Sequence, residues 1–189
     1  MTVPNAPESL AGKLLLAMPD MPDPRFARSV IAICIHDHGG ALGIALGEVV
    51  EGLGLHELLE SFDIEPSAVS DDPVLAGGPM EPRRGFVLHS TDWLTEDSVV
   101  IAEDLALTGS LEVLRAIGSG QGPARYLVAL GYAGWGSGQL EAELTRPGWF
   151  LSALNPRRLF EAVPERRWAA AFASDGIDPA MLAISSGEA

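Results

Sequence analysis

The chain has 189 residues, of which 47% are hydrophobic and 20% charged, so it can bury one core of ordinary size without disulfides. Its net charge of −14 disfavours direct binding to nucleic acid, whose phosphates attract the opposite sign. We expect a cytoplasmic protein that is not in a membrane, because no apolar run approaches about 20 residues, no signal peptide is recognisable, and Cys34 is the single cysteine.

The first half of the chain predicts strands in hairpin pairs. Residues 29–36 form a β-branched apolar run that is typical of a buried strand, and the turn His38-Gly39-Gly40 leads into a partner strand. We expect strands at residues 13–18, 29–36, 41–46, 73–76 and 85–90, a short turn or helix at 25–28, and a helix at 55–61.

Helices alternate with strands in the second half. Thr108 or Ser110 is expected to cap one helix, Ser137 a second, and Asn155 followed by a proline a third. We expect strands at residues 99–102, 105–107, 125–130 and 148–152, and a last helix at 165–174. The two clusters of basic residues, Arg83-Arg84 and the set Arg157, Arg158, Arg166 and Arg167, are expected on solvated surfaces.

Hairpin pairs followed by interleaved helices predict an α+β fold with a mixed, mostly antiparallel sheet and flanking helices. No internal repeat or linker divides the chain, so we expect one domain over residues 11–184. The tails at residues 1–10 and 185–189 are predicted to be disordered.

Two glycine-rich loops are candidates for ligand binding. Residues 131–138 hold four glycines after an apolar run, and a second loop follows residues 73–76. Backbone amides in such turns bind anions, although neither loop matches a phosphate-binding or dinucleotide-binding pattern. The alternative is that the glycines serve close packing and positive φ alone. The candidate ligand-binding residues are Arg25, Arg28, Gly77, Gly78, Pro79, Tyr132, Trp135 and Ser137. For the two arginines, pairing with local carboxylates is the alternative.

Cys34 and His36 are candidate catalytic residues. They lie two apart on a predicted strand, so they are expected to share a face, where a neighbouring histidine can activate a thiol. The alternative for Cys34 is a small buried hydrophobe, the commoner place for a free cysteine. A metal site that joins this pair to Asp37, His38 and His89 is a further alternative, but its spacing is not that of an established metal motif.

Several motifs in order resemble the YqgE/AlgH family of bacterial proteins. They are Asp23-Pro24-Arg25-Phe26-Ala27-Arg28-Ser29-Val30, Cys34-Ile35-His36, Gly40-Ala41-Leu42-Gly43, Leu75-Ala76-Gly77-Gly78-Pro79-Met80, Gly85-Phe86-Val87-Leu88-His89, and residues 130–143 with Trp149 after them. The resemblance implies a compact α+β domain and a regulator of transcription. It implies no catalytic residues.

The expected function is therefore that of a cytosolic binding or regulatory protein that is not an enzyme and uses no cofactor and no metal. Its expected partner is a small anionic ligand or another protein. We expect Cys34, His36 and the two glycine loops to converge on one surface. The alternative is a thiol-dependent redox sensor or enzyme that uses Cys34.

Overall fold

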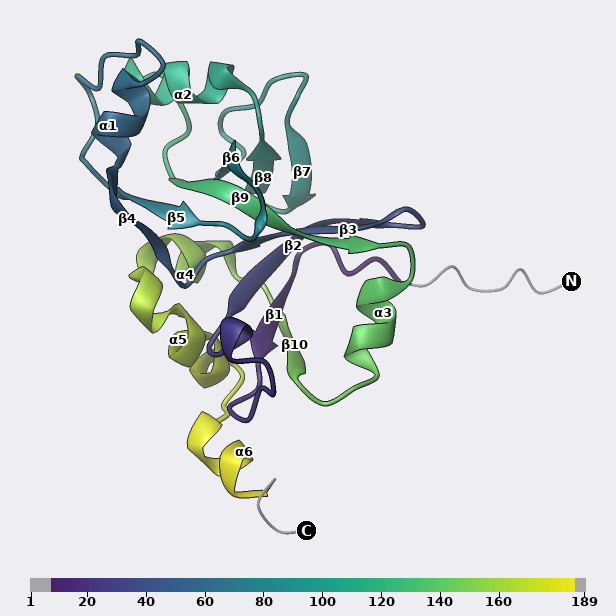
Figure 1. Cartoon of the computed structure of the whole chain (residues 1–189). Coiled ribbons are helices and arrows are strands. Elements are labelled where there is room, and N and C mark those ends of the chain that lie inside the picture. The colour runs from purple at the N-terminus through teal and green to yellow at the C-terminus, as the bar shows by residue number, and fades with distance from the viewer. Residues whose placement is uncertain (1–7, 186–189) are drawn as a thin grey trace, which may run out of the picture.

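A curved ten-stranded sheet organises the fold in a computed structural model that describes residues 8–185 (Figure 1). The strands are β1 Lys13–Ala17, β2 Val30–Asp37, β3 Gly40–Ala45, β4 Val49–Gly54, β5 Pro73–Ala76, β6 Met80–His89, β7 Val99–Ala102, β8 Leu105–Thr108, β9 Tyr126–Gly136 and β10 Trp149–Ala153. Their order is β10-β1-β2-β3-β9-β6-β8-β7, with β4 and β5 on a branch beside β9. All pairs except β5 with β9 are antiparallel, which confirms the predicted fold class.

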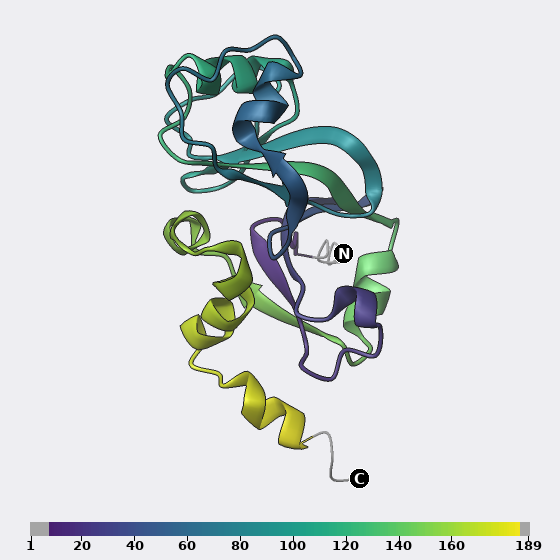
Figure 2. The same ribbon diagram turned by 60° about the vertical axis from the view of Figure 1, so that its left-hand side comes forward.

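Residues 8–185 contain six α-helices. They are α1 Leu55–Glu60, α2 Leu111–Gly118, α3 Gln139–Leu144, α4 Pro156–Glu161, α5 Arg167–Ser174 and α6 Pro179–Ser185, and short 3-10 turns lie at Pro24–Phe26 and Pro164–Arg166. The helices α1 and α2 lie over one half of the sheet, α3 and the pair α4–α5 flank the other half, and α6 extends away from the body (Figures 1 and 2). No helix in residues 8–185 has the length and apolar character to cross a membrane.

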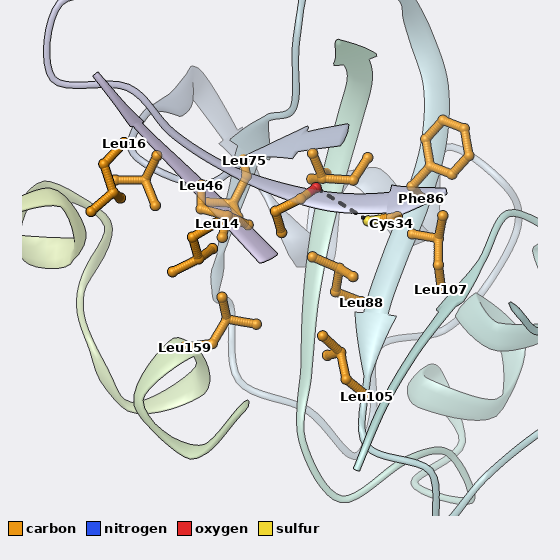
Figure 3. Packing of buried hydrophobic residues seen from close by; sticks show 14 of the residues in the cluster. Leu14, Leu16, Cys34, Leu46, Leu75, Phe86, Leu88, Leu105, Leu107 and Leu159 are labelled. Carbon is orange, nitrogen blue, oxygen red and sulfur yellow. Dashed lines mark hydrogen bonds between the residues drawn. The ribbon is translucent and has the colours of Figure 1, made fainter. Parts of the chain in front are cut away.

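Three clusters of buried side chains make up the core. The largest joins β1, β2, β3, β5, β6, β8 and β9 to α4 and α5, and these two helices contribute Leu159 and Phe172. Leu16, Cys34 and Leu88 are other members of this cluster (Figure 3). A second lies beneath α1 and α2, and a third lies beneath α3. Because all three clusters pack against strands of the same sheet, the described residues form one domain.

The strand β9 holds the two halves of the sheet together. Its first half pairs with β6, and residues 133–136 pair with β3, while β5 runs parallel beside residues 129 and 130. The sequence predicted that the strand would end at residue 130 in a glycine-rich turn, and this prediction was wrong. Met80 of β6 pairs with Tyr132, and β3 pairs with residues 133–136, so these partners keep the segment in the sheet despite its glycines.

Two glycine-containing segments cross in close contact where β5 ends. A Cβ atom on Gly78 would lie 2.2 Å from the carbonyl carbon of Tyr132, and one on Gly131 would lie 2.4 Å from the Gly78 oxygen. Both glycines also have positive φ angles, +149° and +79°. The Gly77 amide donates to Leu130 O at 2.8 Å, which fixes the crossing. Close packing and positive φ, the alternative to ligand binding, therefore account for Gly78 and Gly131.

Local signals predicted most other elements. The bounds of β5 and β7 match the prediction, and the Asn155 side chain caps α4 as expected. The predictions missed β4 and α6, and Gly138 rather than Ser137 is the N-cap of α3. Of the tails predicted to be disordered, residues 1–7 and 186–189 lie outside the described residues.

A fully buried histidine closes a polar network at the end of β6. The Nδ1 atom of His89 lies 2.9 Å from Ser90 O, which can only accept, so Nδ1 donates and Nε2 accepts from the Thr108 hydroxyl at 2.7 Å. Ser98 Oγ lies 2.8 Å from the same hydroxyl. Burial lowers the pKa of His89, although Ser90 O and Asp92 act in the opposite direction.

We expect stability to fall as the pH drops below about 6.5, since the unfolded histidine then binds a proton that the folded His89 refuses. The free energy of unfolding falls by at most about 1.4 kcal/mol per pH unit, and it levels off below the pKa of His89 in the folded protein. Urea denaturation between pH 5 and 7 measures it. The matched variant His89→Gln is less stable at pH 7 and has a shallower pH slope. An equal slope in both proteins would contradict the prediction.

The crossing predicts a large difference between two glycine substitutions. Gly78→Ala puts a methyl group into backbone atoms and destabilises the fold by more than about 4 kcal/mol. Gly138→Ala is the matched control, because Gly138 also has a positive φ, +72°, but nothing within 4 Å of a Cβ atom. It should cost about 1–2 kcal/mol. Thermal or urea denaturation compares the two, and similar losses would show that the crossing is not tight.

Candidate functional site

A groove lies between the segment that joins β1 to β2, the loop after β5, and the end of β9. One part of it, the arginine pocket, has a volume of about 340 Å³ and is lined among others by Arg25, Arg28, Glu48 and Gly78. The other part, the tryptophan pocket, has about 400 Å³ and is lined among others by Met21, Trp135, Arg146 and Trp149. The two parts are continuous, because Phe26, Ile31, Pro79 and Ala133 line both.

The motif Asp23-Pro24-Arg25 forms one wall of the groove. Proline at the first position and the Asp23 carboxylate, which accepts from the Arg25 amide at 3.0 Å, start a single 3-10 turn. The same carboxylate accepts from the Arg25 guanidinium at 2.7 Å, and this contact lowers the pKa of Asp23. The predicted alternative for Arg25, a local ion pair, is therefore present.

Arg28 differs from Arg25 in having no carboxylate partner. No acidic side chain within residues 8–185 forms an ion pair with it. Its backbone is left-handed, with φ of 57°, and its guanidinium carbon lies 5.4 Å from the ring centre of Trp168. The Trp168 indole in turn donates to Ala17 O at 2.8 Å. The arginine is thus held at the groove by an aromatic ring, and its charge is left unneutralised.

Backbone amides in the same part of the groove have no acceptor. Within the described chain, the N–H groups of Gly47, Glu48 and Gly78 donate no hydrogen bond. They lie in loops that line the arginine pocket beside Arg28. Neighbouring free amides and an unpaired guanidinium are the donors that proteins use for carboxylates and phosphates.

Trp135 gives the tryptophan pocket its floor. This residue is 9% exposed, and it packs in the third core cluster with Ile31 and Leu140. The indole N–H donates to Glu143 Oε2 at 3.1 Å, and the other oxygen of that carboxylate accepts from Gln139. The sequence predicted Trp135 as a ligand-binding residue, and Trp135 lines the groove.

Cys34 and His36 do not share a face, contrary to the prediction. Ile33 pairs with Gly43 and Ile35 with Leu42, so β2 has one extra residue at this point, a β-bulge. Cys34 and Ile35 both pack toward the largest cluster, and His36 turns to the opposite face. Neither residue lines the groove, so the predicted single surface of Cys34, His36 and both glycine loops is not formed.

The Cys34 thiol is a buried core group. It is 2% exposed, lies beside Leu88, Phe86 and Leu107, and donates to Ala32 O at 3.4 Å (Figure 3). Burial raises its pKa to about 12. The thiolate is the reactive form, so this environment opposes reactivity and favours the alternative of a small hydrophobe.

His36 fastens the N-terminal segment and α3 to the sheet. The Leu10 amide donates to Nδ1 at 3.0 Å, so Nε2 carries the proton and donates to Glu141 Oε1 at 2.6 Å. The backbone amide of Glu141 and then His36 lower the pKa of that carboxylate. Both ring nitrogens of His36 are therefore engaged in hydrogen bonds.

The structure brings no three His, Cys, Asp or Glu side chains of residues 8–185 together as a metal site, so the alternative through Asp37, His38 and His89 has no geometric support.

Three other predicted ligand-binding residues lie away from the groove. Tyr132 points to the opposite face of β9 from Trp135, edge-on to Phe86 at 5.8 Å, and the adjacent Glu81 raises its pKa. The Ser137 hydroxyl donates to His38 O at 2.6 Å and ties two turns together. Gly77 is buried in the crossing. Alternation along a strand thus separates residues that are neighbours in sequence.

Arg167 is a buried cation that the sequence analysis placed on the surface. It is 6% exposed, and its guanidinium donates to Leu46 O at 2.7 Å and to Leu159 O at 3.3 Å. Burial lowers its pKa to about 10. Leu46 immediately precedes the loop at Gly47 that lines the groove. The residue type does not distinguish Arg167 from its exposed neighbours. The one signal in the sequence is its position on α5 relative to the apolar residues of that helix.

Comparisons of the sequence with known proteins place the chain in a family. The sequence model described as AlgH-like matches residues 14–180. The chain belongs to the AlgH-like family. Two relatives named UPF0301 proteins, from Rhizorhabdus wittichii and Novosphingobium aromaticivorans, are 55% and 54% identical to it. These matches cover 98% and 96% of this chain and 100% and 98% of the relatives.

Two solved structures share the fold of this chain. The solution structure of the AlgH protein from Pseudomonas aeruginosa is 37% identical, with a TM-score of 0.79 over 96% of this chain and 97% of that one. A crystal structure of a protein from Corynebacterium diphtheriae is 21% identical, with a TM-score of 0.67, and covers 84% of this chain and 82% of its own. The second likeness extends to the fold alone.

The environment of Cys34 predicts a slow thiol. We expect its alkylation by iodoacetamide in the folded protein to be at least about a hundredfold slower than in urea, with no plateau below pH 9. The Cys34→Ala variant, which does not react, supplies the blank. Mass spectrometry of timed samples gives the rate. A fast reaction with an apparent pKa at or below that of free cysteine would contradict this expectation and restore the redox alternative.

Proposed function

We propose that this protein is a non-enzymatic binding protein of the bacterial cytoplasm that takes an anionic ligand, or an acidic segment of a partner, into the groove. A regulatory role then follows from binding rather than from chemistry. The observation that carries the proposal is Arg28, an exposed arginine without a carboxylate partner among the described residues, held against Trp168 at the edge of the groove.

The place of this arginine distinguishes it from the other cations. Among the lysines and arginines of the described residues only Arg25 and Arg84 form an ion pair, so an unpaired charge alone is common in this chain. Arg28 packs on the Trp168 ring at the point where it lines the arginine pocket. The free amides of Gly47, Glu48 and Gly78 add donors beside it.

The residues suited to covalent chemistry support binding over catalysis. The Cys34 thiol is buried with a raised pKa, and both ring nitrogens of His36 are bonded. Neither side chain reaches the groove. The net charge of −14 favours a small anion or protein partner over direct contact with DNA as the basis of regulation.

A thermal-shift screen with carboxylate and phosphate-ester metabolites at low salt tests the proposal. We expect at least one anion to raise the Tm of the wild-type protein, because binding to the folded state stabilises it. The shift should disappear in Arg28→Gln. The matched control Arg157→Gln removes an exposed arginine that lies outside the groove, and it should keep the shift. An equal shift in both variants would place the binding elsewhere.

A further inference from the structure

The groove is longer than a single anion requires. Its two parts of about 340 Å³ and about 400 Å³ lie side by side and share Phe26, Ile31 and Pro79. A phosphate or carboxylate group held by Arg28 fills only the arginine pocket. The tryptophan pocket beyond it is walled by the apolar side chains of Met21 and Trp149, so it suits a bulky apolar group.

We propose that the occupant of the groove is a short extended segment of a partner protein, in which an acidic side chain lies next to a large apolar one. This proposal rests on the function proposed above. The acidic side chain binds Arg28, and the apolar side chain enters the tryptophan pocket between Trp135 and Trp149. Main-chain carbonyls of the segment accept from the free amides that line the arginine pocket.

Charge complementarity supports an acidic segment. Arg28 lines one part of the groove and Arg146 the other, and neither forms an ion pair with an acidic side chain of the described residues. Two nearby carboxylates are engaged, Asp23 with Arg25 and Glu143 with the Trp135 indole. Glu48 also lines the groove, and it forms no ion pair with the described residues. Its negative charge would repel a continuous acidic run, so the groove favours a segment with one or two spaced acidic residues.

The backbone of the groove supports a peptide rather than a compact metabolite. Amides at Gly47 and Gly78 come from two different loops, and both lack acceptors within the described chain. An extended peptide presents a carbonyl group about every 3.3 Å and can satisfy donors at more than one place.

Selection from a library of random octapeptides displayed on phage, with the full chain as bait, tests the proposal. We expect a consensus in which Asp or Glu lies within two positions of Leu, Phe or Trp. A synthetic peptide of that consensus, labelled for fluorescence anisotropy, should lose about tenfold in affinity when its acid is changed to the amide. This change leaves the protein untouched, so misfolding cannot explain it.

Variants of the protein then locate the peptide. Arg28→Gln should weaken binding about tenfold, and its effect should be less than additive with the amide change in the peptide, because both remove the same contact. Phe26→Ala should weaken binding of the apolar residue. Arg157→Gln should bind as the wild type does. Circular dichroism and the Tm verify that each variant is folded.

Each outcome decides between the two proposals. A consensus without an acid, or binding that is unchanged by Arg28→Gln, overturns the peptide proposal. If no peptide is selected while a small anion still shifts the Tm through Arg28, the occupant is a small molecule, and the proposed function remains. If neither a peptide nor an anion binds through Arg28, both proposals are wrong.

Discussion

The crossing of two backbones, at Gly78 and at Gly131, is the contact on which the rest of the structure depends. The loop after β5 can lie against β9 only because neither chain carries a Cβ atom there, since a Cβ atom on Gly78 would come within 2.2 Å of the backbone of β9. This contact lets β9 pair with β3 on one stretch and with β6 on another, so one strand joins both halves of the sheet. It also sets Pro79 opposite Ala133, where both line the groove. The glycine-rich segments thus build the wall of the site more than they contact a ligand.

Local signals in the sequence predict the elements that local energetics decide. Short apolar runs predicted β5 and β7 with matching bounds, and an asparagine followed by proline predicted the start of α4. The continuation of β9 through Gly131, Gly134 and Gly136 is different, because glycine by itself favours a turn. The strand persists there since β3 and β6 supply partners that are distant in sequence, and such tertiary support overrides local preference.

The candidate site was predictable only where the type of a residue and its motif were sufficient. Arg28, Pro79 and Trp135 reach one groove from three separate segments, and each had been singled out by its residue type and its place in a motif. Cys34 and His36 were paired by assuming a regular strand, and one extra residue in β2 places them on opposite faces. A bulge of this kind leaves no signature in the sequence, because Ile33 and Ile35 fit either face equally well. The buried position of Arg167 depends likewise on a distant carbonyl, that of Leu46.

The helix α5 connects the groove to the C-terminal part of the chain through two consecutive residues. Arg167 binds the carbonyl next to the groove loop at Gly47, and Trp168 supports Arg28 with its ring while its indole binds Ala17 O. A guanidinium whose pKa burial lowers to about 10 is an unfavourable group to bury, and two carbonyl acceptors offset part of the loss of hydration. Arg167 thus ties α5 to the chain next to the groove loop, while Trp168 of the same helix packs against Arg28. The groove wall at Arg28 and the loop at Gly47 are therefore both positioned by one helix from the C-terminal part of the chain.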